Sequence, residues 1–283
     1  MSAFQPGSAT VFHTTAELSQ LARAWRKLAR PVVLIPAFGE LHAGHLSLVQ
    51  HARRYHDALV IISVLEKADE DLDQARLREL GVDAVFAPST AQLYPNGHRT
   101  TIHPGPLGAE LEGAAFPGQF AEVLTAINKL FHISHCTHAL LSEQHYQLLL
   151  LVQQMVTDLN LEVTVVGGPV VRETDGLALS SHNAELTELE RERALSLSAA
   201  LTAGAYHAGQ GPEGVLSAAR AVLVATPEVE VDYLTLRSPG LGEVDPTGAN
   251  RLLVAARVGN IRLLDNISID FGSEEVTGQP RES

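Results

Sequence analysis

The sequence predicts an α/β protein in which a large Rossmann-like domain with a parallel sheet is followed by a smaller C-terminal α+β domain. Three observations lead to this prediction. Through residues 1–183, short β-branched and apolar runs alternate with segments of helical periodicity, a pattern typical of parallel strands joined by crossover helices. A charged, leucine-rich helix and then strands of alternating polarity follow. The length of 283 residues also exceeds the usual size of one domain.

The first domain is expected to take its strands from the β-branched runs and its helices from the segments between them. Strands are predicted at 32–35, 59–64, 84–87 and 163–166. Helices are predicted where apolar residues recur at helical spacing, at 16–28, 73–80 and 146–159. The stretch 88–118 is rich in Pro and Gly, so we expect a long structured connection of the kind that serves a site or an interface.

The second domain is expected to begin at residue 184 and to end near residue 272. Its helices are predicted at 185–201 and 214–224, and a strand is predicted at 229–234. The runs 251–258 and 261–264 flank Gly259-Asn260 and predict a β-hairpin. The polar residues 273–283 include Gly and Pro and are expected to form a disordered tail.

The composition excludes several classes of function. A formal net charge of -13 would repel a phosphate backbone, so nucleic acid is not expected as a partner. No apolar run reaches the roughly 18 to 20 residues that a membrane-spanning helix needs, and the first residues lack the features of a secretory signal. The lone Cys136 cannot form an internal disulfide, which fits a reducing compartment. We therefore expect a soluble, cytoplasmic protein with no membrane partner.

One segment combines the features of a phosphate-binding turn. The strand 32–35 runs into Pro36-Ala37-Phe38-Gly39 and then into His42-Ala43-Gly44-His45, after which an amphipathic helix begins. Open parallel sheets bind ligands at the carboxyl ends of their strands, and free N–H groups at a helix start favour phosphate. Both imidazoles can donate to phosphate oxygens, and Gly44 allows close approach. A single histidine there would more often be an ordinary surface residue, but this combination predicts an H-x-G-H nucleotidyltransferase-like ATP site.

Further segments carry a resemblance that extends from residue 16 to about residue 272. They include Tyr94-Pro95-Asn96-Gly97, Leu111-Glu112-Gly113, Pro117-Gly118-Gln119-Phe120, Lys129-Leu130-Phe131, the run Arg172-Glu173-Thr174-Asp175-Gly176-Leu177-Ala178-Leu179-Ser180-Ser181-His182-Asn183, Leu252-Leu253-Val254-Ala255-Ala256-Arg257, and Arg262-Leu263-Leu264-Asp265-Asn266. In these segments the sequence resembles the pantothenate synthetase (pantoate–β-alanine ligase) family.

The resemblance implies an AMP-forming ligase that joins pantoate to β-alanine through an acyl adenylate. ATP, Mg²⁺, pantoate and β-alanine are then the expected small molecules, and a homodimer formed through the first domain is the expected assembly. It assigns His42 and His45 as catalytic residues that hold ATP. Further residues expected to bind the nucleotide are Pro36, Phe38, Gly39, Gly44, Ser142, Glu143, Val171, Asp175, Gly176, Leu179, Ser180 and Ser181. No resident metal ligand is assigned. Helix capping is an alternative role for the two serines, and both roles could hold together.

Several positions depart from the family pattern. The family turn Pro-Thr-Met-Gly is Pro-Ala-Phe-Gly here, and the family segment Phe-Val-Asn-Pro-x-Gln-Phe after the second strand is replaced by a shorter connection at 65–69. The family's phosphate-binding lysine is Gln144, its pantoate-binding glutamine is Leu148, and an arginine is His182. Gln144, His145 and His182 are the candidate substitutes at these positions, since a protonated imidazole can replace part of a lost charge.

These departures leave three interpretations open. The first is a pantothenate-forming ligase. The second is a related enzyme that adenylates a different acid. The third is a diverged paralogue that binds nucleotide but is catalytically weak or silent, because loss of one preorganised cationic donor commonly costs about 10² to 10³ in rate. A zinc site at His132, His135, Cys136 and His138 is less favoured than ordinary loop histidines.

Overall fold

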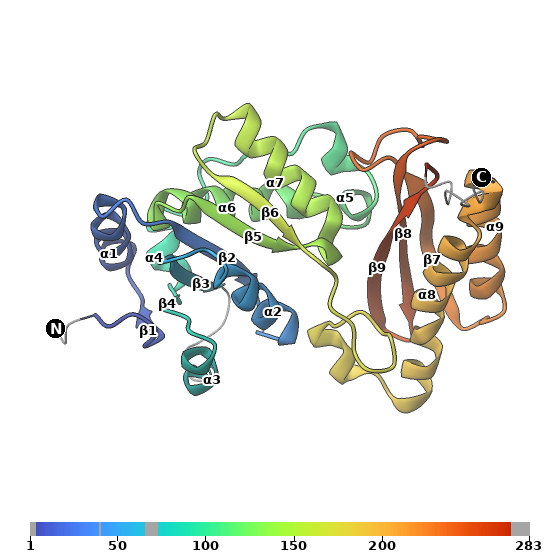
Figure 1. Cartoon of the computed structure of the whole chain (residues 1–283), viewed down its shortest axis with the longest axis horizontal. Coiled ribbons are helices and arrows are strands. Elements are labelled where there is room, and N and C mark those ends of the chain that lie inside the picture. Colours follow the sequence, from blue (N-terminus) through green and yellow to red (C-terminus); the bar gives the residue numbers. More distant parts are fainter. Residues whose placement is uncertain (1–3, 40, 66–72, 273–283) are drawn as a thin grey trace, which may run out of the picture. The chain divides into compact units, whose positions relative to one another are not determined.

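The computed structural model describes residues 4–39, 41–65 and 73–272 (Figure 1). The chain separates into two compact units, of which the first contains the residues up to Val171 together with Leu179–Ser181. The second contains Arg172–Ala178 and the residues from His182 onward. The predicted boundary at residue 184 stays a prediction, and the predicted disordered tail at 273–283 lies outside the described residues.

The first unit is built on a six-stranded parallel sheet with the order β1-β4-β3-β2-β5-β6. Its strands are β1 (Thr10–Phe12), β2 (Val32–Phe38), β3 (Leu59–Leu65), β4 (Ala84–Phe86), β5 (His138–Ser142) and β6 (Thr164–Gly168). The chain adds strands on one side of β2 as far as β4 and then crosses to the other side for β5 and β6. The direction of winding therefore reverses between β2 and β5.

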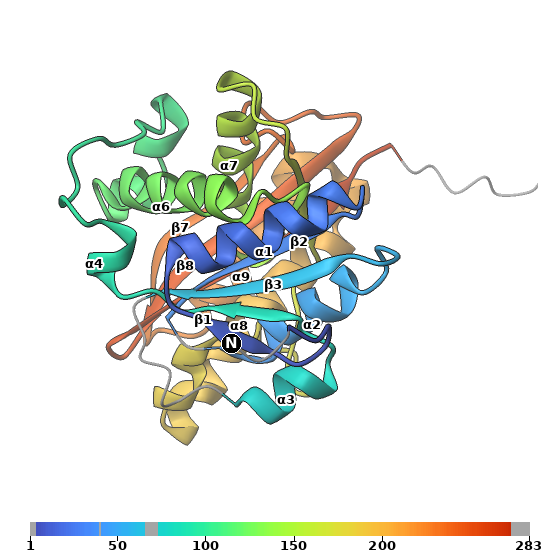
Figure 2. The same ribbon diagram turned by 90° about the vertical axis from the view of Figure 1, so that its left-hand side faces the viewer.

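Helices cover both faces of this sheet because its central strands are apolar on both sides. In β2, Val32 and Leu34 pack into one core, whereas Val33 and Ile35 pack into another. The first core is covered by α1 (Thr15–Lys27), α6 (Gln119–Ser134) and α7 (Tyr146–Asp158), and the second by α2 (Ala43–Ala52) and α3 (Gln74–Glu79). Figure 2 shows α6 and α7 on the side of the sheet opposite α3. The parallel sheet with crossover helices is as predicted, and the helices on both of its faces make the unit doubly wound.

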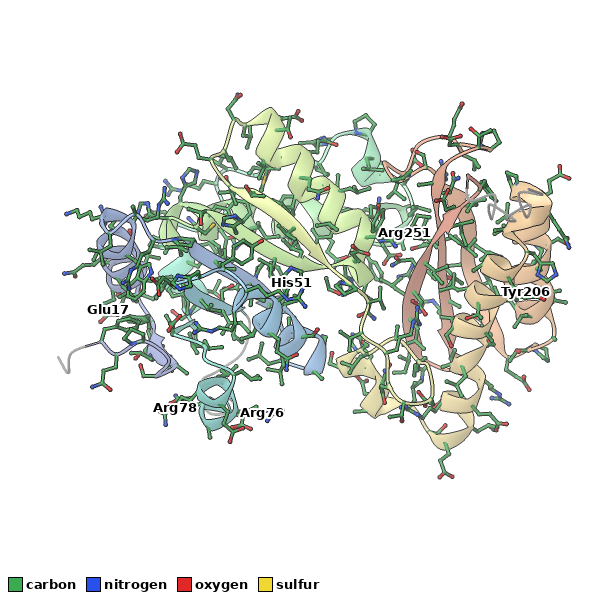
Figure 3. All side chains as sticks on the ribbon, viewed as in Figure 1. Glu17, His51, Arg76, Arg78, Tyr206 and Arg251 are labelled. Carbon is green, nitrogen blue, oxygen red and sulfur yellow. The ribbon has the colours of Figure 1, made fainter. Side chains whose placement is uncertain are left out.

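The starts and ends of these helices follow local hydrogen bonds. Thr14 caps α1, and its hydroxyl donates over 2.6 Å to the carboxylate of Glu17, the residue labelled at this helix in Figure 3. The predicted helices at 16–28, 73–80 and 146–159 are confirmed as α1, α3 and α7. Strands β1 and β5 and helix α6 had no counterpart among the predicted elements.

The predicted connection at 88–118 contains short helices. They are α4 (Thr90–Leu93), a 3₁₀ turn at Pro106–Ala109 and α5 (Glu112–Ala115). The buried amide of Gln147, in the first turn of α7, holds this segment by donating to the carbonyl oxygens of Leu107 and Glu110 over 2.7 and 2.9 Å. It also accepts from the N–H of Glu112 over 3.0 Å.

Asp83 is a buried carboxylate at the amino-terminal edge of the sheet, directly before β4. It accepts from the N–H of Val60 over 2.7 Å and from that of Gly7 over 2.6 Å, and Arg53 lies 3.6 Å away. Burial raises the pKa of Asp83 against the opposing effect of these donors. The carboxylate thus joins β3 to the residues that precede β1.

The second unit packs two helices on a three-stranded antiparallel sheet with the order β7-β8-β9. Its elements are a 3₁₀ turn at Ser181–Glu185, α8 (Glu188–Tyr206), a 3₁₀ turn at Ala208–Gln210, α9 (Gly211–Val224), β7 (Val229–Arg237), β8 (Ala249–Val258) and β9 (Ile261–Asp270). Val258 pairs with Ile261, so the predicted hairpin around Gly259-Asn260 is confirmed.

Tyr206, labelled in Figure 3, is 88% exposed. In the part of the chain that is described, no helix is long and apolar enough to cross a membrane.

Candidate functional site

The candidate site lies where the winding of the parallel sheet reverses. Pro36, Phe38 and Gly39 stand at the carboxyl end of β2, and Ser142 and Glu143 at that of its neighbour β5. Val171 follows β6, which pairs with β5. Carboxyl ends of neighbouring parallel strands on either side of such a reversal form a crevice that binds ligands in open α/β sheets.

The end of β2 is shaped by residues that allow a turn. Pro36 has no N–H, and it lies beyond the stretch of β2 that pairs with β5, which covers Val33 and Leu34. Gly39 has φ of +77°, a conformation that glycine adopts without strain, and its N–H donates to the carbonyl of Leu65 over 3.2 Å. The chain therefore leaves the sheet in a tight turn directly before α2. Glu40 and residues 66–72, which include most of the shortened connection, lie outside the described residues.

Two half-buried histidines form the cap of helix α2. His42 is the N-cap residue, and its Nδ1 accepts from the N–H of Gly44 over 3.2 Å. His45, three residues later, forms the reciprocal hydrogen bond: its Nδ1 accepts from the N–H of His42 over 3.3 Å. This is the reciprocal arrangement of a capping box, in which imidazoles take the places usually held by a hydroxyl and a carboxylate.

The direction of these hydrogen bonds fixes the tautomer of each ring. A backbone N–H can only donate, so each Nδ1 must carry a lone pair and the hydrogen of a neutral ring must lie on Nε2. The ring centroids of His42 and His45 are 4.2 Å apart. Two Nε2–H donors consequently stand side by side at the start of α2, where the helix dipole already favours an anion.

The ring of His42 occupies the space that a side chain at position 44 would need. A Cβ on residue 44 would lie 2.8 Å from Cε1 of His42 and 2.9 Å from its Nδ1, closer than real Cβ contacts. The backbone of Gly44 is ordinary helix, so the requirement for glycine is steric and comes from the imidazole. The spacing H-x-G-H thus follows from the geometry of the cap.

Both histidines are neutral near pH 7. Burial, and then the neighbouring His145, lower the pKa of His42 below 6.5. Burial, followed by the proximity of His42 and His145, lowers the pKa of His45 to about 3. The structure therefore brings His145, at the start of α7, together with the H-x-G-H pair. The pair His42 and His45 thus offers hydrogen-bond donors without permanent positive charge.

Two glycines at the end of β6 allow α2 and the end of β5 to approach this strand. A Cβ on Gly168 would lie 2.2 Å from Cδ2 of Leu48 in α2, and a Cβ on Gly167 would lie 3.1 Å from Oε1 of Glu143. Glu143 belongs to the 3₁₀ turn Glu143–His145, whose start is capped by Ser142 through the N–H of Gln144 over 3.2 Å. Gly167 and Gly168 were not among the predicted site residues, and their effect depends on tertiary packing.

The segment that follows Val171 is a short hairpin. The N–H of Leu179 donates to the carbonyl of Val171 over 2.9 Å, Arg172 forms a bridge with Ala178, and the N–H of Glu173 donates to Leu177 over 2.8 Å. Gly176 turns the tip with φ of +97°. Val171 and Leu179 belong to the first unit, whereas the tip, with Asp175 and Gly176, belongs to the second.

The charged side chains of this hairpin belong to the second unit and bind other residues of the same unit. Arg172 forms two hydrogen bonds with the buried carboxylate of Asp265, over 2.6 and 2.9 Å. Arg191 of α8 donates to Glu173 over 2.6 Å and to Asp175 over 2.6 and 2.9 Å. Desolvation raises the pKa of Asp175, but hydrogen bonds from Leu177 and Arg191 outweigh it and hold the pKa below its usual value. Arg191 was not predicted, because no local spacing signals a partner 16 residues away.

The remaining predicted residues are placed as follows. Ser181 opens a 3₁₀ turn, and Thr187 caps α8, so the interpretation that one of the two serines caps this long helix is wrong. His182 lies 3.0 Å from a carboxylate oxygen of Glu185. Among the described residues no group of three or more His, Cys, Asp or Glu side chains is arranged to hold a metal ion.

A family model described as pantoate-β-alanine ligase matches residues 10–268 of this chain. The chain belongs to the pantoate–β-alanine ligase family. It is 54% identical over 284 residues to pantothenate synthetase of Corynebacterium jeikeium, covering 95% of this chain and 93% of that relative. It is 49% identical over 293 residues to pantothenate synthetase of Mycobacterium sp. strain KMS, covering 98% of this chain and 94% of the relative.

Solved structures of the family share the fold. A crystal structure of pantothenate synthetase from Thermus thermophilus superposes with a TM-score of 0.81 at 38% identity and covers 91% of this chain and 98% of that chain. A pantoate–β-alanine ligase of Francisella tularensis, in complex with β,γ-ATP and β-alanine, gives 0.75 at 25% identity, with 91% and 97% covered. The predicted family, the α/β fold class and the ligase function are confirmed.

Proposed function

We propose that this protein condenses pantoate with β-alanine in an ATP-dependent, AMP-forming reaction that yields pantothenate. Membership of the pantoate–β-alanine ligase family across residues 10–268 carries this proposal. The geometry of the site supports it, since the paired Nε2–H donors of His42 and His45 stand at a helix start beside the reversal of the sheet. Such a place suits the phosphates of a nucleotide.

The reaction has two steps. A carboxylate oxygen of pantoate attacks the α-phosphorus of ATP, the bond to the leaving pyrophosphate breaks, and an acyl adenylate forms. The amine of β-alanine then attacks the acyl carbon, AMP leaves with the electron pair of the broken C–O bond, and the amine loses a proton. Negative charge accumulates on the phosphate oxygens in the first step, so donors aimed at these oxygens lower its barrier.

We assign His42 and His45 to these oxygens as neutral donors, with His145 beside them. By the family resemblance, Gln144 and His182 stand where relatives have fixed cations, and we assign charge stabilisation among the described residues to the imidazole donors and the N-terminus of α2. The backbone around Val171 and Leu179 is assigned to the adenine, and the hydroxyls of Ser180 and Ser181 to phosphate. Pro36, Phe38 and Gly39 form the turn that adjoins the nucleotide.

Mg²⁺ is proposed to enter with ATP. The described residues do not supply a cluster of three or more candidate ligands, which fits an ion held chiefly by phosphate oxygens and water. Its chemical contribution is to neutralise phosphate charge during attack at the α-phosphorus.

The assembly and location follow from the family resemblance. We propose a homodimer formed through the first unit and a cytoplasmic location. Analytical ultracentrifugation of the full chain tests the first proposal, and a monomer at micromolar concentration would contradict it. Cell fractionation tests the second.

A pyrophosphate-release assay with ATP, pantoate and β-alanine, combined with mass detection of pantothenate, tests the function. Turnover that requires all three substrates is expected. Background release with every substrate present would refute catalysis, and release with another acid in place of pantoate would indicate a different substrate. A variant carrying Gln144→Lys and His182→Arg restores the two cations. A gain in its turnover would show that charge limits the rate, whereas no gain would place the limitation in the acid pocket.

A further inference from the structure

The hairpin at Arg172–Ala178 carries acidic side chains that already have protein partners. Oδ1 of Asp175 accepts from the N–H of Leu177 over 3.2 Å, and Oδ2 accepts from Nε and Nη2 of Arg191. Oε1 of Glu173 accepts from the amide of Asn183 over 2.6 Å, and Oε2 accepts from Arg191. These carboxylates are thus used to hold the hairpin in one shape.

Arg191 occupies an unfavourable position for a cation. It follows the first turn of α8, whose cap is Thr187, and the positive end of a helix dipole disfavours a guanidinium there. Two carboxylates compensate for this cost, and the guanidinium binds both of them at once. The exposed fraction of the Arg191 side chain is 32%, and those of Glu173 and Asp175 are 28% and 30%, so the network is partly shielded from water.

The hairpin is continuous with the segments on either side of it. Val171 directly precedes Arg172, and Leu179 directly follows Ala178, and these flanking residues pair through a hydrogen bond of 2.9 Å. Any change in the twist or opening of the hairpin therefore turns the backbone groups of Val171 and Leu179. In the proposed function these groups, with Ser180 and Ser181, receive the nucleotide.

We infer that Arg191 is a positioning residue for the nucleotide. It pairs with the carboxylates of Glu173 and Asp175 and thereby fixes the backbone conformation at Val171 and Leu179. This inference rests on the proposed function. It also changes the role predicted for Asp175, whose carboxylate acts through Arg191 instead of contacting ATP. Arg172 contributes in the same way from the other edge, because it joins the carbonyl of Gly176 over 3.1 Å to the carboxylate of Asp265.

The test uses Arg191→Met, which removes the charge at similar volume, with Arg193→Met as the matched control. Arg193 lies on the same helix and forms a comparable ion pair with Glu228 over 3.0 Å, away from the hairpin. Calorimetry with ATP and Mg²⁺ is expected to show about tenfold weaker binding by Arg191→Met, which corresponds to about 1.4 kcal/mol. The control should bind as the unaltered protein does. Arg191→Lys keeps the positive charge but lacks the planar guanidinium with its several donors. Its affinity for ATP should therefore lie between those of Arg191→Met and the control.

Two further measurements separate positioning from a general structural effect. The KM for ATP should rise in Arg191→Met while the KM for β-alanine and the thermal unfolding midpoint match those of Arg193→Met. A double-mutant cycle with Asp175→Asn should be strongly non-additive, because both changes break one interaction. Equal ATP affinity in Arg191→Met, or additive losses in the cycle, would overturn the inference alone. Failure of the unaltered protein to bind ATP would overturn the proposed function and this inference with it.

Discussion

Replacing Gly44 with alanine should separate the stability of helix α2 from its chemical role. A Cβ at this position would lie 2.8 Å from the ring of His42, so the imidazole must turn and give up its bond to the N–H of residue 44. Losing a helix cap costs about 1 kcal/mol. Alanine in place of glycine within a helix returns about 1 kcal/mol. The free energy of unfolding should therefore change by less than about 1 kcal/mol.

The same change should nevertheless reduce catalysis severely. Turning the ring moves the Nε2–H of His42 away from the position that it holds beside His45, and loss of one preorganised donor costs about 10² to 10³ in kcat. Pyrophosphate release in Gly44→Ala is thus expected to fall by at least about a hundredfold. Thermal unfolding of the same preparation shows whether the fold survives.

Gly209→Ala is the matched control, because a Cβ at Gly209 would have no atom within 4 Å. It should retain full activity. ¹⁵N NMR of the ligand-free Gly44→Ala protein then reports whether the Nδ1 of His42 has lost its backbone donor, independently of any contact between residue 44 and the nucleotide. Activity within about twofold of the unaltered protein, about 0.4 kcal/mol in the barrier, would refute this account of the H-x-G-H spacing.

Three other variants test the stability of the first unit. The folded pKa of His45, about 3, lies below the unfolded value of 6.5, so its contribution to stability is complete above pH 6.5 and is lost as pH falls toward 3. His45→Gln should remove this dependence, which approaches about 1.4 kcal/mol per pH unit, whereas the exposed His56→Gln should keep it in the same chemical unfolding series. Gln147→Leu removes three hydrogen bonds to the segment 107–112 and should lower the unfolding free energy by about 1–3 kcal/mol. Proteolysis within this segment should become faster, and an unchanged rate of proteolysis would contradict the prediction. Asp83→Ala leaves two backbone donors without their carboxylate and should cost about 2–4 kcal/mol in denaturant titrations while ATP affinity stays constant.

The sequence predicted the parts of the fold that one strong local pattern defines. The β-branched runs of β2 and β3 favour strands, and a continuous apolar run indicates burial on both faces. Strand β5, with the sequence His-Ala-Leu-Leu-Ser, has no β-branched residue and becomes a strand because β2 and β6 lie on either side of it. Strand β1 has three residues and depends on pairing with β4. Strands β1 and β5 therefore depend on tertiary contacts, which a short stretch of sequence does not reveal.

The same limit applies to the site. The H-x-G-H segment and its helix predicted a place for phosphate, because strand, turn and helix start are adjacent in sequence. The tautomers of His42 and His45 depend on side chains that bend back to their own backbone, which composition does not reveal. The sequence pattern did not identify the partner of Asp175 for a different reason. Arg191 lies in a helix that the pattern did predict, but which face of that helix meets the hairpin is decided by packing in the second unit.

The histidine cap also decides which ions this helix start can attract. A neutral imidazole binds a transition metal through a nitrogen lone pair. In this pair the lone pairs on Nδ1 already accept from the N–H groups of Gly44 and His42. Shifting the hydrogen from Nε2 to Nδ1 would set two donors against each other and break the cap. The arrangement therefore discriminates against cations such as zinc and leaves the pair available to anions.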